Sequence, residues 1–142
     1  MKTITAVQQY NQYACVAACL ESAKRDFGDA TFSHQEFVQR NSELFNGGLP
    51  TEGSCDSTNL PEVASRCGLS INRIQCGAIA CDTDNEALVA FVFWNGDHGQ
   101  KHFVRLIEHK SNEISIMNPQ GAIFQNIPTS WLQAAFILKN KC

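Results

Sequence analysis

The chain has 142 residues, of which 44% are hydrophobic and 18% charged, a composition typical of a globular protein with one core. Its net charge of −3 and the absence of a basic stripe exclude a nucleic-acid-binding surface. No apolar run in the sequence reaches the roughly 20 residues that span a bilayer, so we expect no membrane segment in this chain. We expect one domain over residues 1–142.

Cysteine usage and the N-terminus bear on the compartment. Lys2 is followed by no apolar segment, so no signal peptide is expected, and the seven cysteines are an odd number that argues against a full disulfide framework. We expect a cytoplasmic protein, or an effector that reaches its target cell without a signal peptide. Neither the Cys15/Cys19 nor the Cys76/Cys81 spacing is a paired CxxC, so we expect no metal site and no cofactor.

The first predicted elements are an extended arm or short strand over residues 1–8 and a helix over residues 15–27. Apolar side chains spaced four, three and four apart fall on one helical face: Val16, Leu20, Ala23 and Phe27. Gly28 then ends the helix. Cys15 therefore lies in the first turn, where unpaired N–H groups and the macrodipole are expected to lower the pKa of a thiol from about 8.5.

Two further helices are predicted from capping residues. Ser33 and Glu36 form a capping box, which predicts a helix from residue 33 to about residue 44. His34 lies in its first turn and is expected on the surface. A third, short helix is predicted after residues 57–59, because Pro61 suits a helix start and Gly68 stops the apolar face that runs from Leu60 to Cys67.

After residue 68 the hydrophobic pattern changes to alternation or to continuous apolar runs, which indicates strands. A short helical turn is expected at residues 86–88, where a buried strand begins. The predicted strands are 69–74, 87–94, 102–107, 114–117, 122–125 and 134–138. Helices followed by a meander of strands predict an α+β fold with an antiparallel sheet.

The residues with catalytic chemistry are distributed between these two halves. Cys15 opens the first helix, His102 begins a strand, and Asn118 ends the next strand. Because hairpin partners place the start of one strand beside the end of the other, we expect His102 and Asn118 to be neighbours. A thiolate nucleophile needs a base, and the base needs a third group that fixes its ring.

Other interpretations of these residues remain open at this point. Cys15 can be a small hydrophobic core residue, as free cysteine often is. His98 is an alternative to His102, although it lies in a turn where histidines are usually solvated. Asp97 and Glu108 are alternative groups to orient the imidazole, and Asn118 before a proline is also an ordinary turn residue.

Three motifs resemble one known family: Gln9-x5-Cys15-x3-Cys19-Leu20, His102-Phe103-Val104 and Asn118-Pro119. They resemble the peptidase domain of bacteriocin-processing ABC transporters, which are papain-like cysteine peptidases that cleave leader peptides after a double glycine. The segment over residues 53–68 also resembles this family in outline. The resemblance implies a papain-like fold in which N-terminal helices pack on an antiparallel sheet.

Carried over residue by residue, the resemblance implies Cys15 as nucleophile, His102 as general base and acid, and Asn118 as the orienting group. Gln9 becomes the side-chain donor of the oxyanion hole, together with the backbone N–H of Cys15. Gln8 and Gln12 are the neighbouring alternatives to Gln9. The implied activity is that of a thiol hydrolase acting on a peptide or protein amide, with a transporter or a cognate inhibitor as partner.

The chain departs from the family pattern at three positions near these motifs. Ala14, Val16 and Asn118 stand where the family has Asp, Gly and usually Asp. These departures, with the absence of transporter and ATPase portions from the sequence, leave two alternatives. One is a protein-glutamine deamidase of the same fold, as in bacterial toxins. The other is a non-catalytic module that binds leader peptides.

Overall fold

The computed structural model describes residues 4–75 and 86–140 of the chain, so the expectations about Cys76 and Cys81 lie outside the described residues. The helices within these ranges are α1 (Cys15–Asp26), α2 (His34–Arg40) and α3 (Leu60–Arg66). The strands are β1 (Leu69–Ile74), β2 (Glu86–Phe93), β3 (Lys101–His109), β4 (Glu113–Asn118), β5 (Ile123–Pro128) and β6 (Leu132–Asn140). None of the described helices is long and apolar enough to cross a membrane.

The described strands form one antiparallel sheet in the order β1-β6-β2-β3-β4-β5. Strands β2 to β5 are the hairpin meander that the sequence predicts. Strand β6 was not expected where it lies, because it returns from the far end of the chain to pair with both β1 and β2. The α+β class with an antiparallel sheet is confirmed.

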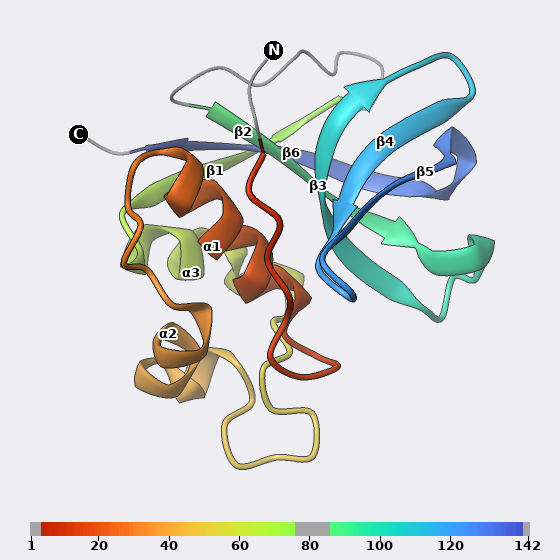
Figure 1. Cartoon of the computed structure of the whole chain (residues 1–142). Helices are drawn as coiled ribbons and strands as arrows, with labels where there is room; N and C mark the ends of the chain where they lie inside the picture. The colour runs from red at the N-terminus through yellow and green to blue at the C-terminus, as the bar shows by residue number, and fades with distance from the viewer. Residues whose placement is uncertain (1–3, 76–85, 141–142) are drawn as a thin grey trace.

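The helices gather on one side of the sheet, and β3, β4 and β5 curve away on the other (Figure 1). Strand β2 is buried on both faces, so its side chains alternate between two cores. Those that face the helical core are Ala87, Val89 and Phe91. Those that face the second core are Leu88, Ala90 and Val92. This double burial explains the continuous apolar run in the sequence.

Helix α1 begins at Cys15, as expected, and ends one residue before the predicted Phe27. Its end is fixed by Gly28, whose φ of 103° is readily available only to glycine. The N–H of Gly28 donates to the carbonyl of Arg25 at 3.0 Å, and that of Asp29 to the carbonyl of Lys24 at 2.9 Å. The N–H groups that follow the helix therefore bond to carbonyls in its last turn, which would otherwise lack partners.

Helix α2 starts as predicted but is shorter. The side chain of Ser33 accepts a hydrogen bond from the N–H of Glu36, as a capping box requires. The helix ends at Arg40, because Asn41 leaves the helical conformation and its side chain donates to the carbonyl of Phe37 at 2.8 Å. The remainder of the predicted helix is a separate 3-10 turn over Ser42–Leu44.

Two expectations are wrong. The helical turn at residues 86–88 does not form, because Glu86 already pairs with Lys139 in the sheet. His34 is not on the surface but only 6% exposed. Its ring Nδ1 lies 3.0 Å from Glu21 Oε1, and its Nε2 accepts a hydrogen bond from the backbone N–H of Tyr10 at 3.1 Å. Packing of α2 against α1 buries this ring.

A buried ion pair ties the sheet to α1 and to the N-terminal arm (residues 4–14). Arg105 of β3 is fully buried and donates to Asp26 Oδ2 at 2.6 Å and to Ser22 Oγ at 2.8 Å. The other oxygen of Asp26 accepts from the backbone N–H and the hydroxyl of Thr5, at 3.0 and 2.7 Å. One carboxylate thus joins three parts of the chain.

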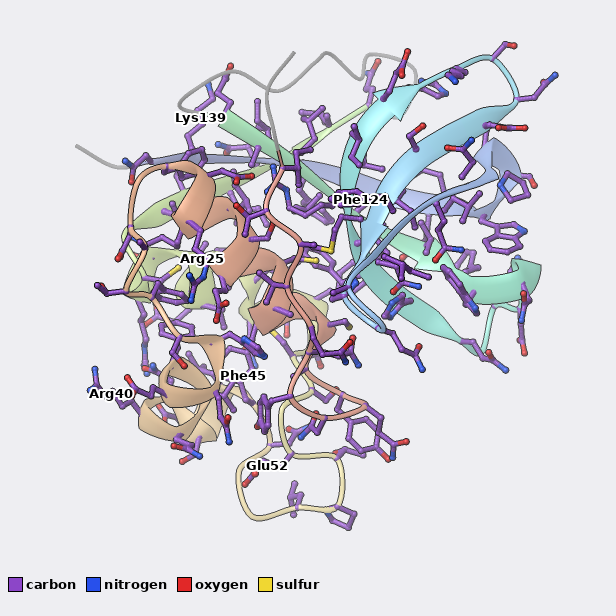
Figure 2. The ribbon with its side chains drawn as sticks, in the orientation of Figure 1. Arg25, Arg40, Phe45, Glu52, Phe124 and Lys139 are labelled. Carbon is purple, nitrogen blue, oxygen red and sulfur yellow. The ribbon has the colours of Figure 1, made fainter. Side chains whose placement is uncertain are left out.

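We predict that Arg105→Met lowers the free energy of unfolding by about 3–5 kcal/mol, because it leaves the Asp26 carboxylate buried without its cation. The matched control is Arg40→Met. Arg40 points outward from α2 in Figure 2, and its pair with Glu36 is 80% and 67% exposed, so the expected change is below about 1 kcal/mol. Urea denaturation measures both. Equal midpoints for the two variants would contradict the prediction.

Candidate active site

The thiol of Cys15 lies where α1 meets the start of β3. Ala14 is the residue before the helix and provides no side-chain cap, and no acidic residue occurs in the first turn. The backbone N–H groups of Cys15, Val16 and Phe103 all hydrogen-bond toward the thiol. Because Phe103 directly follows His102 in β3, the fold brings the first helix to the strand that carries the imidazole.

Burial decides the protonation state of this thiol. Desolvation raises the pKa of Cys15, and the three backbone N–H groups that lower it only partly offset this effect. The N–H groups at the helix start lower the pKa of Cys15 as expected, but the expected net lowering is wrong because desolvation outweighs them. The donors are present, but partial burial of Cys15 removes part of the water that would stabilise a thiolate.

His102 is held by a direct hydrogen bond to Asn118. Its ring Nε2 lies 2.7 Å from Asn118 Oδ1, so the predicted neighbourhood of these two residues is observed. The ring of Trp94 meets the imidazole edge to face, with centroids 5.4 Å apart. Burial lowers the pKa of His102, and the hydrogen bond to Asn118 raises it by less. The imidazole is consequently neutral at neutral pH.

The contacts of Asn118 identify which end of its amide faces the imidazole. Its Oδ1 also accepts from the backbone N–H of Gln120 at 2.9 Å, and a backbone N–H can only donate. The atom facing His102 is therefore the oxygen, and the Nε2 of His102 carries the proton. Nδ1 of the same ring is left as the nitrogen that can accept one.

Gln9 is held against the loop that follows Asn118. Its backbone N–H donates to the carbonyl of Pro119 at 2.9 Å, and its side-chain Nε2 donates to the carbonyl of Asn11 at 2.8 Å. Next to it, Gln8 Oε1 accepts from the N–H of Gly121 at 2.7 Å. Figure 1 shows this arm running between α1 and the β4–β5 loop.

Gln9 differs from the neighbouring glutamines in its burial. It is 4% exposed, and its Oε1 is buried with no hydrogen-bond partner in the described structure. Gln8 and Gln12 are both exposed. Of the three, Gln9 is the buried one, and its backbone is bonded to the loop that follows Asn118.

The alternatives to His102 and Asn118 have other surroundings. His98 is exposed, and its ring lies 4.4 Å from that of Phe93. Asp97 accepts a hydrogen bond from the N–H of Gly99 within the turn. Glu108 is exposed near the far end of β3. In the described part of the chain, the side chain that bonds to the imidazole of His102 is that of Asn118.

A cavity of about 360 Å³ opens beside the thiol. Its lining comes from α1 and the segment before it, the loop before α3, and strands β1, β2, β3 and β6: Tyr13, Cys15, Val16, Ser54, Cys55, Asp56, Ser57, Arg73, Phe91, Lys101, Gln133, Ala134 and Phe136. Burial raises the pKa of Cys55 to about 12, so this second thiol stays protonated. Cys15 lines this cavity, and His102 does not.

Sequence analysis gave no role to three residues that support the site. Gln125 accepts a hydrogen bond from the side-chain nitrogen of Asn118 at 2.9 Å. Trp94 packs against the imidazole, and His34 holds the backbone of Tyr10 next to Gln9. A role for Gln125 could have been predicted from the sequence, because it is a polar residue of β5 on the same face of the sheet as Asn118 of β4.

A family model described as the peptidase C39 family matches residues 3–136. The structure is similar to the peptidase domain of Streptococcus ComA, a bi-functional ABC transporter involved in a quorum sensing pathway. The TM-score is 0.68 at 15% identity, over 98% of this chain and 100% of that one. It is also similar to a double glycine motif protease from an AMS/PCAT transporter, solved with a leader peptide. Here the TM-score is 0.60 at 17% identity, over 99% and 94% of the two chains. No curated protein matches the sequence.

Because the pKa of Cys15 is raised, we predict that its alkylation by iodoacetamide accelerates about tenfold per pH unit up to and beyond about pH 8.5, the usual thiol pKa. Mass spectrometry of the peptide that contains Cys15 gives the rate. A Cys15→Ser protein reports the background from the remaining cysteines. A rate that is already constant between about pH 6 and 8 would instead indicate a resting thiolate–imidazolium pair, against the prediction.

Proposed function

The chain belongs to the peptidase C39 family, and from that premise we propose that it is a cysteine peptidase that cuts a peptide amide bond. The observation that carries the proposal is the hydrogen bond of 2.7 Å between His102 and Asn118, at the start of the strand that meets Cys15. This bond fixes the tautomer of the proposed base, and the next residue, Phe103, directs its backbone N–H toward the thiol of Cys15.

In the proposed reaction, the sulfur of Cys15 attacks the carbonyl carbon while the thiol proton passes to Nδ1 of His102. The imidazolium then gives this proton to the leaving amine, and a thioester remains on the sulfur. Water, deprotonated by the same imidazole, releases the acid and regenerates the thiol. The raised pKa of Cys15 and the lowered pKa of His102 keep both groups neutral at rest. The proton therefore moves as the attack occurs.

The developing oxyanion needs donors that are already in place. The Nε2 of Gln9 carries two hydrogens, of which one is held by the carbonyl of Asn11, so one remains for the oxyanion. The backbone N–H of Cys15 has no intrahelical partner at the helix start and points toward its own thiol, so it would turn to the oxyanion once the sulfur bonds to carbon. A single donor of this kind contributes about 2.7–4 kcal/mol to barrier lowering.

The cavity beside Cys15 suits the part of the substrate that remains on the sulfur. It is lined by Cys15 and by Lys101, but not by His102, Asn118 or Gln9. Because His102 must protonate the leaving amine, the leaving segment lies on the imidazole side and the acyl segment on the cavity side. We propose a leader peptide with a double glycine as substrate, by analogy with the transporter protease whose structure contains a leader peptide.

A second candidate function is a peptide-binding module without catalysis. The observation that favours it is the burial that raises the pKa of Cys15, because a protonated thiol is a weak nucleophile. Such a module keeps the cavity beside Cys15 but forms no thioester. It would bind double-glycine peptides and release them unchanged.

We predict that Cys15→Ala and His102→Ala fold normally and lower kcat/KM on double-glycine peptides by at least about 100-fold, since each removes a group that bonds or transfers a proton. His98→Ala is the matched control and should retain activity. Mass spectrometry of the products separates two fragments, which mean proteolysis, from a gain of about one dalton, which means side-chain deamidation. Full activity in either triad variant would remove the cysteine-peptidase proposal.

The pH dependence of kcat/KM follows from His102. The base must be neutral, and burial lowers its pKa from 6.5, so the neutral form persists to lower pH than for a free imidazole. We predict that activity falls only as the pH drops through a midpoint below 6.5. A midpoint at or above 7, measured from initial rates across a buffer series, contradicts this environment for the ring.

A further inference from the structure

Asn118 differs from a carboxylate because its two ends are chemically different. A carboxylate presents an oxygen to the imidazole in either orientation, whereas an amide turned by a half-rotation presents an N–H. That N–H would face the proton on Nε2 of His102 and could not bond to it. The site therefore needs hydrogen-bond partners that keep the oxygen of Asn118 toward the ring.

Gln125 of β5 lies where it can be one of these partners. Asn118 pairs with Ile123 and Ile116 pairs with Gln125, so Gln125 lies two residues along from the direct partner of Asn118. Side chains two apart on a strand share a face, and such diagonal neighbours are within reach of long side chains. The Nδ2 of Asn118 donates to Oε1 of Gln125 at 2.9 Å.

We propose that Gln125 is a positioning residue, which fixes the amide of Asn118 so that its oxygen orients His102. The backbone N–H of Gln120 holds the oxygen end of that amide, and Gln125 accepts from the nitrogen end. Turning the amide breaks both contacts, because it places an N–H against the N–H of Gln120 and an oxygen against Oε1 of Gln125. The catalytic part of this inference rests on the proposed peptidase function, whereas the effect on the ring tautomer does not.

The arrangement has a reciprocal requirement that can be tested. With asparagine at position 118, residue 125 must accept a hydrogen bond, so Gln125→Glu should preserve the amide and Gln125→Lys should turn it. With aspartate at position 118, residue 125 must donate, so Lys becomes favourable and Glu unfavourable. Gln125 is half-buried, so either charged side chain can be accommodated.

The experiment measures the His102 ring tautomer by long-range proton–nitrogen NMR, together with kcat/KM on a double-glycine peptide. The proteins are the wild type, Q125E, Q125K, N118D, N118D/Q125E and N118D/Q125K. Asn126→Lys is the control, because it places the same charge on the neighbouring, exposed residue of β5. Thermal melting checks that each protein is folded.

We expect the Nε2–H tautomer in the wild type, in Q125E and in the control. Q125K should shift the ring toward Nδ1–H and lower kcat/KM by about tenfold or more, the effect of losing one hydrogen bond in an oriented network. With aspartate at position 118 an oxygen faces the ring in either orientation, so the Nε2–H tautomer should persist in N118D, N118D/Q125E and N118D/Q125K. The kcat/KM of N118D/Q125K should match that of N118D, and that of N118D/Q125E should be lower, because two carboxylates then face each other.

If Q125K keeps the wild-type tautomer and the wild-type kcat/KM, the proposal is overturned. It is also overturned if kcat/KM falls equally in Q125E and Q125K, because an equal fall indicates general damage to β5. If the tautomers follow the expected pattern but none of the proteins, including the wild type, cleaves the peptide, the positioning role of Gln125 stands and the proposed peptidase function is rejected.

Discussion

The hydrogen bond between His102 and Asn118 is the interaction on which the site depends. It joins the start of β3 to the end of β4 and determines which nitrogen of the imidazole carries a proton. Because Asn118 Oδ1 also accepts from the backbone of Gln120, the direction of this bond follows from the fold rather than from the side chains alone. The chemistry available to Cys15 follows from that direction.

The N-terminal arm is held by side chains and backbone groups from several parts of the domain. Its backbone is anchored at Thr5 by Asp26, at Gln9 by Pro119 and at Tyr10 by His34. The same arm carries Gln9 and then leads into α1. Charged and polar groups from α1, α2 and the β4–β5 loop therefore fix this extended segment. The cost of burying those groups is offset by the pairs they form.

Local patterns in the sequence predicted much of this arrangement. The capping box at Ser33 and the apolar spacing from Val16 fix helix starts, since both depend on neighbours within one turn. The approach of His102 to Asn118 was predictable because a hairpin brings together residues that are close in sequence. The catalytic roles of these residues and of Gln9 remain predictions.

The features that were missed depend on contacts between distant segments. The insertion of β6 between β1 and β2 joins residues far apart in sequence, and no local pattern encodes that choice. His34 is buried because α2 packs on Glu21 of α1, and the pKa of Cys15 is raised because several elements enclose it. The role of Gln125 required the register between β4 and β5.

The central claim is that Cys15, His102 and Gln9 act on one carbonyl group. A peptide aldehyde that ends in Gly-Gly tests it most directly, because its adduct with a thiol resembles the tetrahedral intermediate. A crystal structure of that complex should show a covalent bond to Cys15 Sγ. The adduct oxygen should lie within about 3 Å of Gln9 Nε2 and the Cys15 N–H. The peptide should occupy the cavity beside the thiol. An unmodified Cys15, or an adduct whose oxygen points away from both donors, would contradict the account.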